Sequence, residues 1–269
     1  MQEAARHAAR GSVVSRLEAV GWEVLPFDAV VLRWAEAAHR AAMAVVAEPA
    51  ERDRWLRHDA TWFVGVDVLP NTPDGSIDGV PLDGRWRARV DWPGPWHRAQ
   101  LSVVYPGYPG RDPGESDAAH AFRRDRDAAH LDGLLALGPA KRRYLREPHG
   151  FIAGLPLNAV APGASPLVVW EGSAPIIRAA MGRVFAGIAP QDLADCDVTN
   201  AYQAARREVF DTCPRRVIHA APGQVVLMHR MAVHGVAPWQ EGAEAPAEGR
   251  MVAYFRPILD DPAVWLLPG

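Results

Sequence analysis

Short runs of β-branched, aromatic and aliphatic residues recur through the last two-thirds of this chain, and turns rich in proline and glycine separate them. The runs cover residues 61–68, 100–105, 151–157, 166–170, 224–228 and 250–256. Runs of this length and punctuation are typical of strands in a sandwich or barrel, and they do not favour a parallel α/β sheet. No G-x-G-x-x-G or G-x-x-x-x-G-K-[ST] motif follows a strand, so a nucleotide-binding fold has no support.

The first third of the chain has a different texture, because its apolar residues follow helical spacing. Asp28 can cap a helix whose apolar face runs from Val31 to Val45 and which ends near Pro49. Two further helices are predicted, one after Ser173-Ala-Pro175 with a hydroxyl cap, and one over about residues 198–211. We therefore predict one domain over residues 1–269, in which a mostly helical portion (about 1–60) packs on a β-rich core (about 61–260).

Composition excludes several classes of protein. The 269 residues are 49% hydrophobic and carry a formal net charge of −3, so a core can form and no basic surface suited to nucleic acid is expected. Two cysteines, Cys196 and Cys213, are too few for a disulfide framework. No apolar run reaches the roughly 18 residues needed to cross a bilayer, and residues 1–20 lack the apolar stretch of a secretory signal. We expect a cytoplasmic protein that binds neither membrane nor nucleic acid, and the sequence favours no oligomeric state.

The segment with most chemical information is His130-Leu-Asp132. In extended backbone, residues two positions apart point to the same face, so this imidazole and carboxylate can meet at one point. A third ligand is offered by His234, which ends a β-like run and is followed by glycine. Two histidines and one carboxylate form the facial triad of non-haem iron(II) sites, although zinc accepts the same ligands. His229 lies five positions before His234, would face the other way in a strand, and is interpreted as structural.

From about Trp96 to Pro257 the chain resembles the phytanoyl-CoA dioxygenase-like family of 2-oxoglutarate oxygenases. The resemblance runs in order through the strand 101–106, the H-x-D motif and the strand 151–157. It continues through Gly163-Ala-Ser-Pro-Leu-Val-Val-Trp-Glu-Gly-Ser173, which is similar to the family's N-G-x-L-x-V-x-P-G-S-H. Residues 222–238 are similar to its G-D-x-V-x-F-x-x-x-x-x-H-G-S-x-P-N, and an arginine-led strand follows.

The resemblance implies a double-stranded β-helix (a cupin-like jelly roll) and a dioxygenase that uses Fe(II), with 2-oxoglutarate and O₂ as co-substrates. Its usual reaction would be hydroxylation of a small organic molecule with release of succinate and CO₂, and desaturation or another oxidation stays open. His130, Asp132 and His234 would be the metal ligands. The family's arginine, which binds the far carboxylate of 2-oxoglutarate, is assigned to Arg250, 250 − 234 = 16 positions after His234. Arg256 is the rival, because it lies on the same face of the predicted strand. The family's Gly-Ser-His becomes Gly-Ser-Ala here, which leaves the triad unchanged.

Two functions from other classes stay open at this point. One is a β-barrel protein that binds a small molecule without turning it over. The other is a zinc-dependent hydrolase that uses the same triad.

Overall fold

Two antiparallel sheets dominate the computed structural model, which describes residues 17–90 and 92–267. The larger sheet has the strand order β1-β10-β7-β12-β4-β3-β2 and the smaller one β11-β8-β9, while β5 and β6 form a separate hairpin. Strand bounds are β1 Trp22–Leu25, β2 Leu56–Arg57, β3 Trp62–Gly65, β4 Gln100–Val104, β5 Leu134–Leu137, β6 Arg142–Leu145, β7 Phe151–Pro156, β8 Leu167–Trp170, β9 Arg215–Ile218, β10 Val225–His229, β11 His234–Val236 and β12 Arg250–Phe255. Within the described residues, neighbouring strands in all three sheets run antiparallel.

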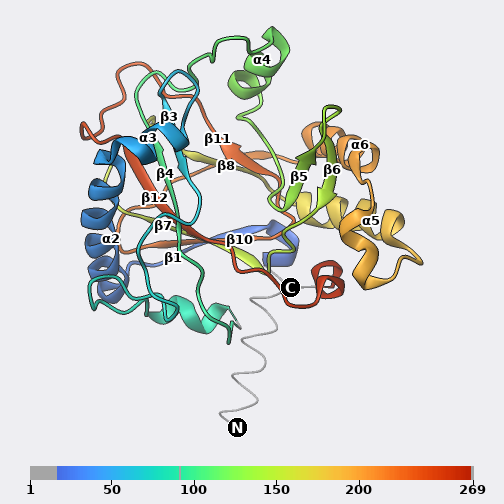
Figure 1. Cartoon of the computed structure of the whole chain (residues 1–269), viewed down its shortest axis with the longest axis horizontal. Coiled ribbons are helices and arrows are strands. Elements are labelled where there is room, and N and C mark those ends of the chain that lie inside the picture. The colour runs from blue at the N-terminus through green and yellow to red at the C-terminus, as the bar shows by residue number, and fades with distance from the viewer. Residues whose placement is uncertain (1–16, 91, 268–269) are drawn as a thin grey trace.

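Helices cover the outer faces of both sheets. Their bounds are α2 Ala29–Ala47, α3 Pro49–Trp55, α4 Asp117–Asp125, α5 Ser173–Phe185 and α6 Thr199–Thr212, with 3₁₀ helices η1 Arg85–Arg89, η2 Pro190–Asp195 and η3 Pro262–Leu266. Figure 1 shows α2 along one side of the large sheet, with α5 and α6 together at the opposite side of the molecule. No helix in these described ranges is both long enough and apolar enough to cross a membrane.

Strand β8 shows how one short sequence builds two cores. Its alternate side chains point to opposite faces, and all four residues are buried. Leu167 and Val169 pack in the space between the two sheets, whereas Val168 and Trp170 pack outward against α5 and α6. The predicted alternation of the β-rich core is therefore present, and the fold is the double-stranded β-helix that the sequence suggested.

Helix α2 begins where its sequence predicted. The Asp28 carboxylate accepts a hydrogen bond from the Val30 backbone N–H at 2.9 Å, and the helix ends before Pro49. Its buried face, which includes Trp34 and Ala38, packs on the outer side of the large sheet. This packing anchors the helical portion on the β-helix, although residues 1–16 of the predicted portion lie outside the described residues.

Two local expectations need correction. Helix α5 starts at Ser173 itself after Gly172, and the Ser173 hydroxyl accepts a hydrogen bond from the Val233 backbone N–H at 2.9 Å and does not cap the helix. The first third also contributes the strand β1, which pairs with β10 at one edge of the large sheet. In each case a partner distant in sequence decides the local structure.

Candidate metal centre

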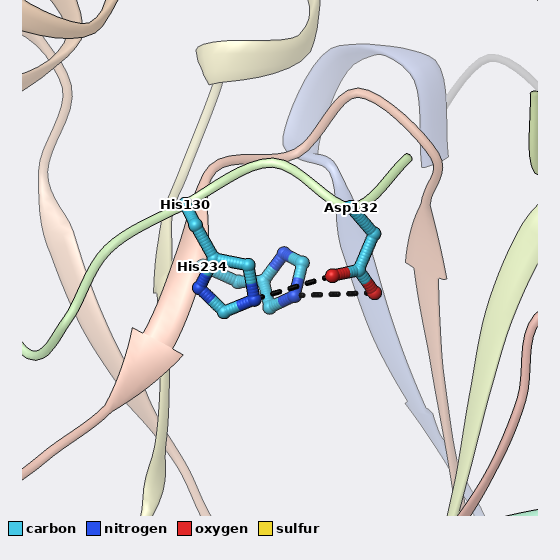
Figure 2. Close-up of side chains that lie close together, drawn as sticks. All are labelled: His130, Asp132 and His234. Carbon is cyan, nitrogen blue, oxygen red and sulfur yellow. Dashed lines mark ion pairs between the residues drawn. The ribbon is translucent and has the colours of Figure 1, made fainter. Parts of the chain in front are cut away.

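The side chains of His130, Asp132 and His234 converge at one end of the space between the sheets (Figure 2). One ligand atom from each lies within 4.8 Å of the others. The Nε2 atom of His130 is 3.2 Å from Oδ1 of Asp132, and the Nε2 atom of His234 is 3.8 Å from Oδ2. Distances of this size allow all three atoms to contact one metal ion placed between them.

Backbone pairing brings the two histidines together. His130 and His234 form an isolated antiparallel bridge, with N–H···O distances of 2.8 and 3.1 Å in the two directions. Residues that face each other in this way carry their side chains on the same side. As a result the imidazole centroids are 4.6 Å apart, although 104 positions separate the residues (234 − 130).

Each imidazole is oriented by a carbonyl two residues before it. The Nδ1 atom of His130 is 3.0 Å from the Ala128 oxygen, and the Nδ1 atom of His234 is 2.9 Å from the Ala232 oxygen. A carbonyl only accepts, so Nδ1 carries the proton in both rings and each Nε2 lone pair points to the centre. Hydrogen bonds of this kind commonly fix the tautomer of metal-ligating histidines.

The charge state of the centre also suits a cation. Burial on its own raises the pKa of Asp132, but the Arg256 guanidinium and the two imidazoles outweigh it, so the pKa of this carboxyl lies well below its usual value. Burial lowers the pKa of His234 to about 4. At neutral pH the centre therefore offers an ionised carboxylate and a neutral, unprotonated His234, which are the forms that bind metal.

Two glycines let the ligand-bearing segments approach each other. A Cβ on Gly235 would lie 2.1 Å from the Asp127 carbonyl oxygen, and a Cβ on Gly133 would lie 2.1 Å from the Glu147 oxygen. Gly133 also has a φ of +84°, which residues with a side chain rarely adopt. Each ligand segment, His-Leu-Asp-Gly and His-Gly, thus ends in a glycine required by contact with backbone.

A cavity of about 250 Å³ adjoins the three ligands. It is bordered by the larger sheet through Trp62, Val64, Gln100, Ser102, Ile152, Met228 and Tyr254, and by Leu135, Glu147, Leu167, Val236 and Arg256. Trp62 and Tyr254 are the aromatic side chains that line this cavity among the described residues. Glu147 is a polar residue that sequence analysis did not identify; its place after the β5–β6 hairpin carries no motif.

Arg250, which begins β12, and Arg256, which follows its last residue, lie in different surroundings. Arg256 lines the metal cavity, and its Nη1 atom is 3.3 Å from Oδ2 of Asp132. Arg250 is not among the residues that line this cavity. It lines a second cavity of about 240 Å³, which meets the first at Leu167 and Tyr254.

His229 and a second group of possible ligands lie outside the centre. His229 is buried, with Nε2 2.9 Å from the Glu18 carboxylate and Nδ1 accepting the Met231 N–H. A second group of possible ligands in the described ranges consists of His58, Asp112 and Glu115, and an arginine side chain already lies against it. The Arg123 guanidinium lies 2.9 Å from Nε2 of His58 and pairs with Glu115. This group reads as an ion-pair network and not as a metal site.

No protein-family model matches the sequence, and no curated protein matches it significantly. Solved structures do match. The chain is similar to the non-heme alpha ketoglutarate dependent carbocyclase SnoK from nogalamycin biosynthesis, with 15% identity, a TM-score of 0.51, and coverage of 96% of this chain and 91% of that one. It also matches the epimerase SnoN in complex with Fe³⁺, alpha ketoglutarate and nogalamycin RO (14%, TM-score 0.49, coverage 93% and 84%). A third match is EctD from S. alaskensis with 2-oxoglutarate and 5-hydroxyectoine (16%, TM-score 0.44, coverage 90% and 73%).

At this level of identity, the likeness to SnoK establishes the fold alone. The chain is thus a double-stranded β-helix protein with a candidate His-Asp-His metal centre. The narrower resemblance to the phytanoyl-CoA dioxygenase-like family stays a prediction.

Proposed function

We propose that this protein is an Fe(II)- and 2-oxoglutarate-dependent oxygenase that acts on a small organic molecule. The observation that carries the proposal is the convergence of two fixed Nε2 lone pairs and one ionised carboxylate beside a cavity. A mixed nitrogen and oxygen set suits Fe(II) better than Ca²⁺ or Mg²⁺, which prefer oxygen ligands alone. The names of the structural neighbours support the same metal and co-substrate.

His130, Asp132 and His234 would hold the metal. When bound there, Fe(II) with 2-oxoglutarate and O₂ supplies the oxidising power to attack a C–H bond, with succinate and CO₂ released. The residues of the chain contribute orientation and exclusion of water. The Ala128 and Ala232 carbonyls hold the imidazoles in their ligating tautomer, and Arg256 supports the ionised form of Asp132.

Arg250 is our candidate for the far carboxylate of 2-oxoglutarate. Its Nη1 atom is buried without a hydrogen-bond partner among the described residues, and a buried guanidinium is stable only when an anion or acceptor satisfies it. Arg256 also has a buried nitrogen without a partner among the described residues, its Nε, but its Nη1 already pairs with Asp132. A carboxylate that entered the cavity at Arg250 would meet a planar, permanently charged donor able to bind both of its oxygens.

The strand register supports the choice of Arg250, because it places this residue at the level of the metal cavity. Arg250 pairs with Val104 on β4, and Val104 pairs with Trp62 on β3. Since Trp62 lines the metal cavity, that cavity extends along the sheet to the level of Arg250. Tyr254, which borders both cavities, is the side chain that 2-oxoglutarate would pass.

Matched variants on one strand face test the proposal. Arg250→Gln should raise the KM for 2-oxoglutarate by about 10- to 100-fold, the effect of losing a charged hydrogen bond of about 1.5–3 kcal/mol. Arg256→Gln should weaken Fe(II) binding, since Asp132 loses its ion pair. The reverse pattern would assign the anchor to Arg256, and no 2-oxoglutarate turnover with any metal would refute the oxygenase. Hydrolytic activity of the zinc-loaded protein, without oxidation by the iron-loaded protein, would favour the hydrolase.

A further inference from the structure

A larger cavity opens beside the metal centre and reaches the protein surface. It has a volume of about 530 Å³ and shares Val66, Glu147 and Arg256 with the metal cavity. At its outer end lie Asp260, which is exposed, and Ile258, whose side chain is 50% exposed. We call this cavity the entry groove, because it connects solvent with the residues around the candidate metal centre.

One wall of the entry groove is apolar and rigid. Trp92, Pro93, Pro95 and Ile258 line it. The Trp92 indole N–H donates to the Pro95 carbonyl at 3.2 Å, and its ring meets Phe151 edge-on with centroids 6.4 Å apart. These contacts hold a flat aromatic surface against the groove, which suits a ring or hydrocarbon chain more than a strongly hydrated ligand.

The polar residues of the groove carry a surplus of negative charge. Asp67, Glu147 and Asp260 are its carboxylates. Arg256 is the one arginine that lines it among the described residues, and its Nη1 pairs with Asp132 while its Nε has no partner there. Asp260 makes no hydrogen bond or ion pair to any described residue. Within residues 17–90 and 92–267, Arg256 is thus the one permanent cation of the groove, against three carboxylates.

Neither histidine of the groove reverses that balance. The Nε2 atom of His97 accepts the Arg256 backbone N–H at 2.7 Å and so carries no proton, while Nδ1 lies 3.1 Å from Asp67. With one nitrogen accepting, His97 is neutral and leaves the charge of Asp67 in place. The Nε2 atom of His149 is 3.3 Å from the Glu147 carboxylate. Even if the charges of His149 and Glu147 cancel, the negative charges of Asp67 and Asp260 remain in the groove.

We propose that the substrate is an organic amine, with a cationic nitrogen held by the carboxylates of the entry groove and an apolar body packed on Trp92. Oxidation of the bound amine rests on the proposed oxygenase function, whereas binding of the amine does not. Because Glu147 borders both cavities, an ammonium group beside it places the adjacent carbon atoms at the mouth of the metal cavity.

The test compares two probes with the same ring and opposite charge, 2-phenylethylamine and 3-phenylpropionate. Calorimetry on the full chain at low salt should show the amine binding about tenfold more tightly, and this advantage should shrink at 0.5 M salt because ions screen exposed charges. Glu147→Gln and Asp260→Asn should each reduce amine affinity severalfold. Asp260→Asn is the safer variant for folding, since the side chain is exposed and unpaired among the described residues.

Asp53→Asn is the matched control, because Asp53 is an exposed carboxylate on α3 that does not line the groove. It should leave both affinities unchanged. Equal binding of the two probes, a preference for the carboxylate, or an equal effect of Asp53→Asn and Asp260→Asn would overturn the proposal.

The outcome is separable from that of the proposed function. A charge-transfer band from anaerobic Fe(II) and 2-oxoglutarate reports the metal centre. Amine preference without that band would support the groove and refute the oxygenase, while the band without amine preference would do the opposite.

Discussion

Gly235→Ala should disable the metal centre without touching a ligand. The new Cβ would lie 2.1 Å from the Asp127 carbonyl oxygen, and contacts under 3.0 Å are essentially never tolerated, so one backbone must move by at least 3.0 − 2.1 = 0.9 Å. That movement separates the strands that hold the His130–His234 bridge. Metal–ligand distances tolerate only about 0.2 Å, so the ligand set would lose its geometry.

We expect Gly235→Ala to lower Fe(II) affinity by at least about tenfold, and to cost about 1–3 kcal/mol of unfolding free energy, as overpacking of a buried site does. Anaerobic Fe(II) titration and urea unfolding measure the two effects. Gly182→Ala is the control, because a Cβ at this position in α5 meets nothing within 4 Å and alanine favours helix. Native metal affinity in Gly235→Ala would refute the view that backbone contact positions the ligands.

Three further predictions concern the scaffold and the cavities. Asp28→Ala should destabilise the protein by about 1 kcal/mol through loss of the α2 cap. Hydrogen bonds from the backbone N–H groups of Arg85 and Val30 lower the pKa of Asp28. The stabilisation is therefore fully present above the ordinary aspartate pKa of 3.8 and is lost as the pH falls through the lowered pKa. Urea unfolding at pH 7 and pH 3 would show it, and an equal difference at both pH values would contradict it. Gly154→Ala should raise the KM for 2-oxoglutarate severalfold, because its Cβ would lie 2.8 Å from the Tyr254 ring and push it toward the junction of the cavities; an unchanged KM would argue against that path. His229→Ala should lower the melting temperature yet keep succinate formation, and loss of turnover in a folded variant would make His229 functional.

Alternation and turn residues were enough to predict six of the twelve strands in the described residues. The runs at 100–105, 151–157, 166–170, 224–228 and 250–256 correspond to β4, β7, β8, β10 and β12 within one or two residues. These strands are buried on defined faces, so their sequence pattern reports their surroundings. Strand β1 was missed because it is short and its place at a sheet edge depends on pairing with β10.

The candidate ligands could be found because their spacing is local. His130 and Asp132 share a face two positions apart, and His234 is marked by the glycine after it. The contact of Arg256 with Asp132 and the place of Glu147 depend on which strands and loops meet across the barrel. Residue spacing does not predict contacts between segments that are distant in sequence, so the substrate side of the centre could be found only from the structure.

Anaerobic titration of the full chain with Fe(II) and 2-oxoglutarate tests the central claim most directly. We predict a weak metal-to-ligand charge-transfer band that saturates at one Fe(II) per chain, is absent from His130→Ala, and is retained in His229→Ala. The absence of this band from the wild-type protein, or its persistence at full intensity in His130→Ala, would contradict the assignment of His130, Asp132 and His234 as the iron ligands of a 2-oxoglutarate-dependent oxygenase.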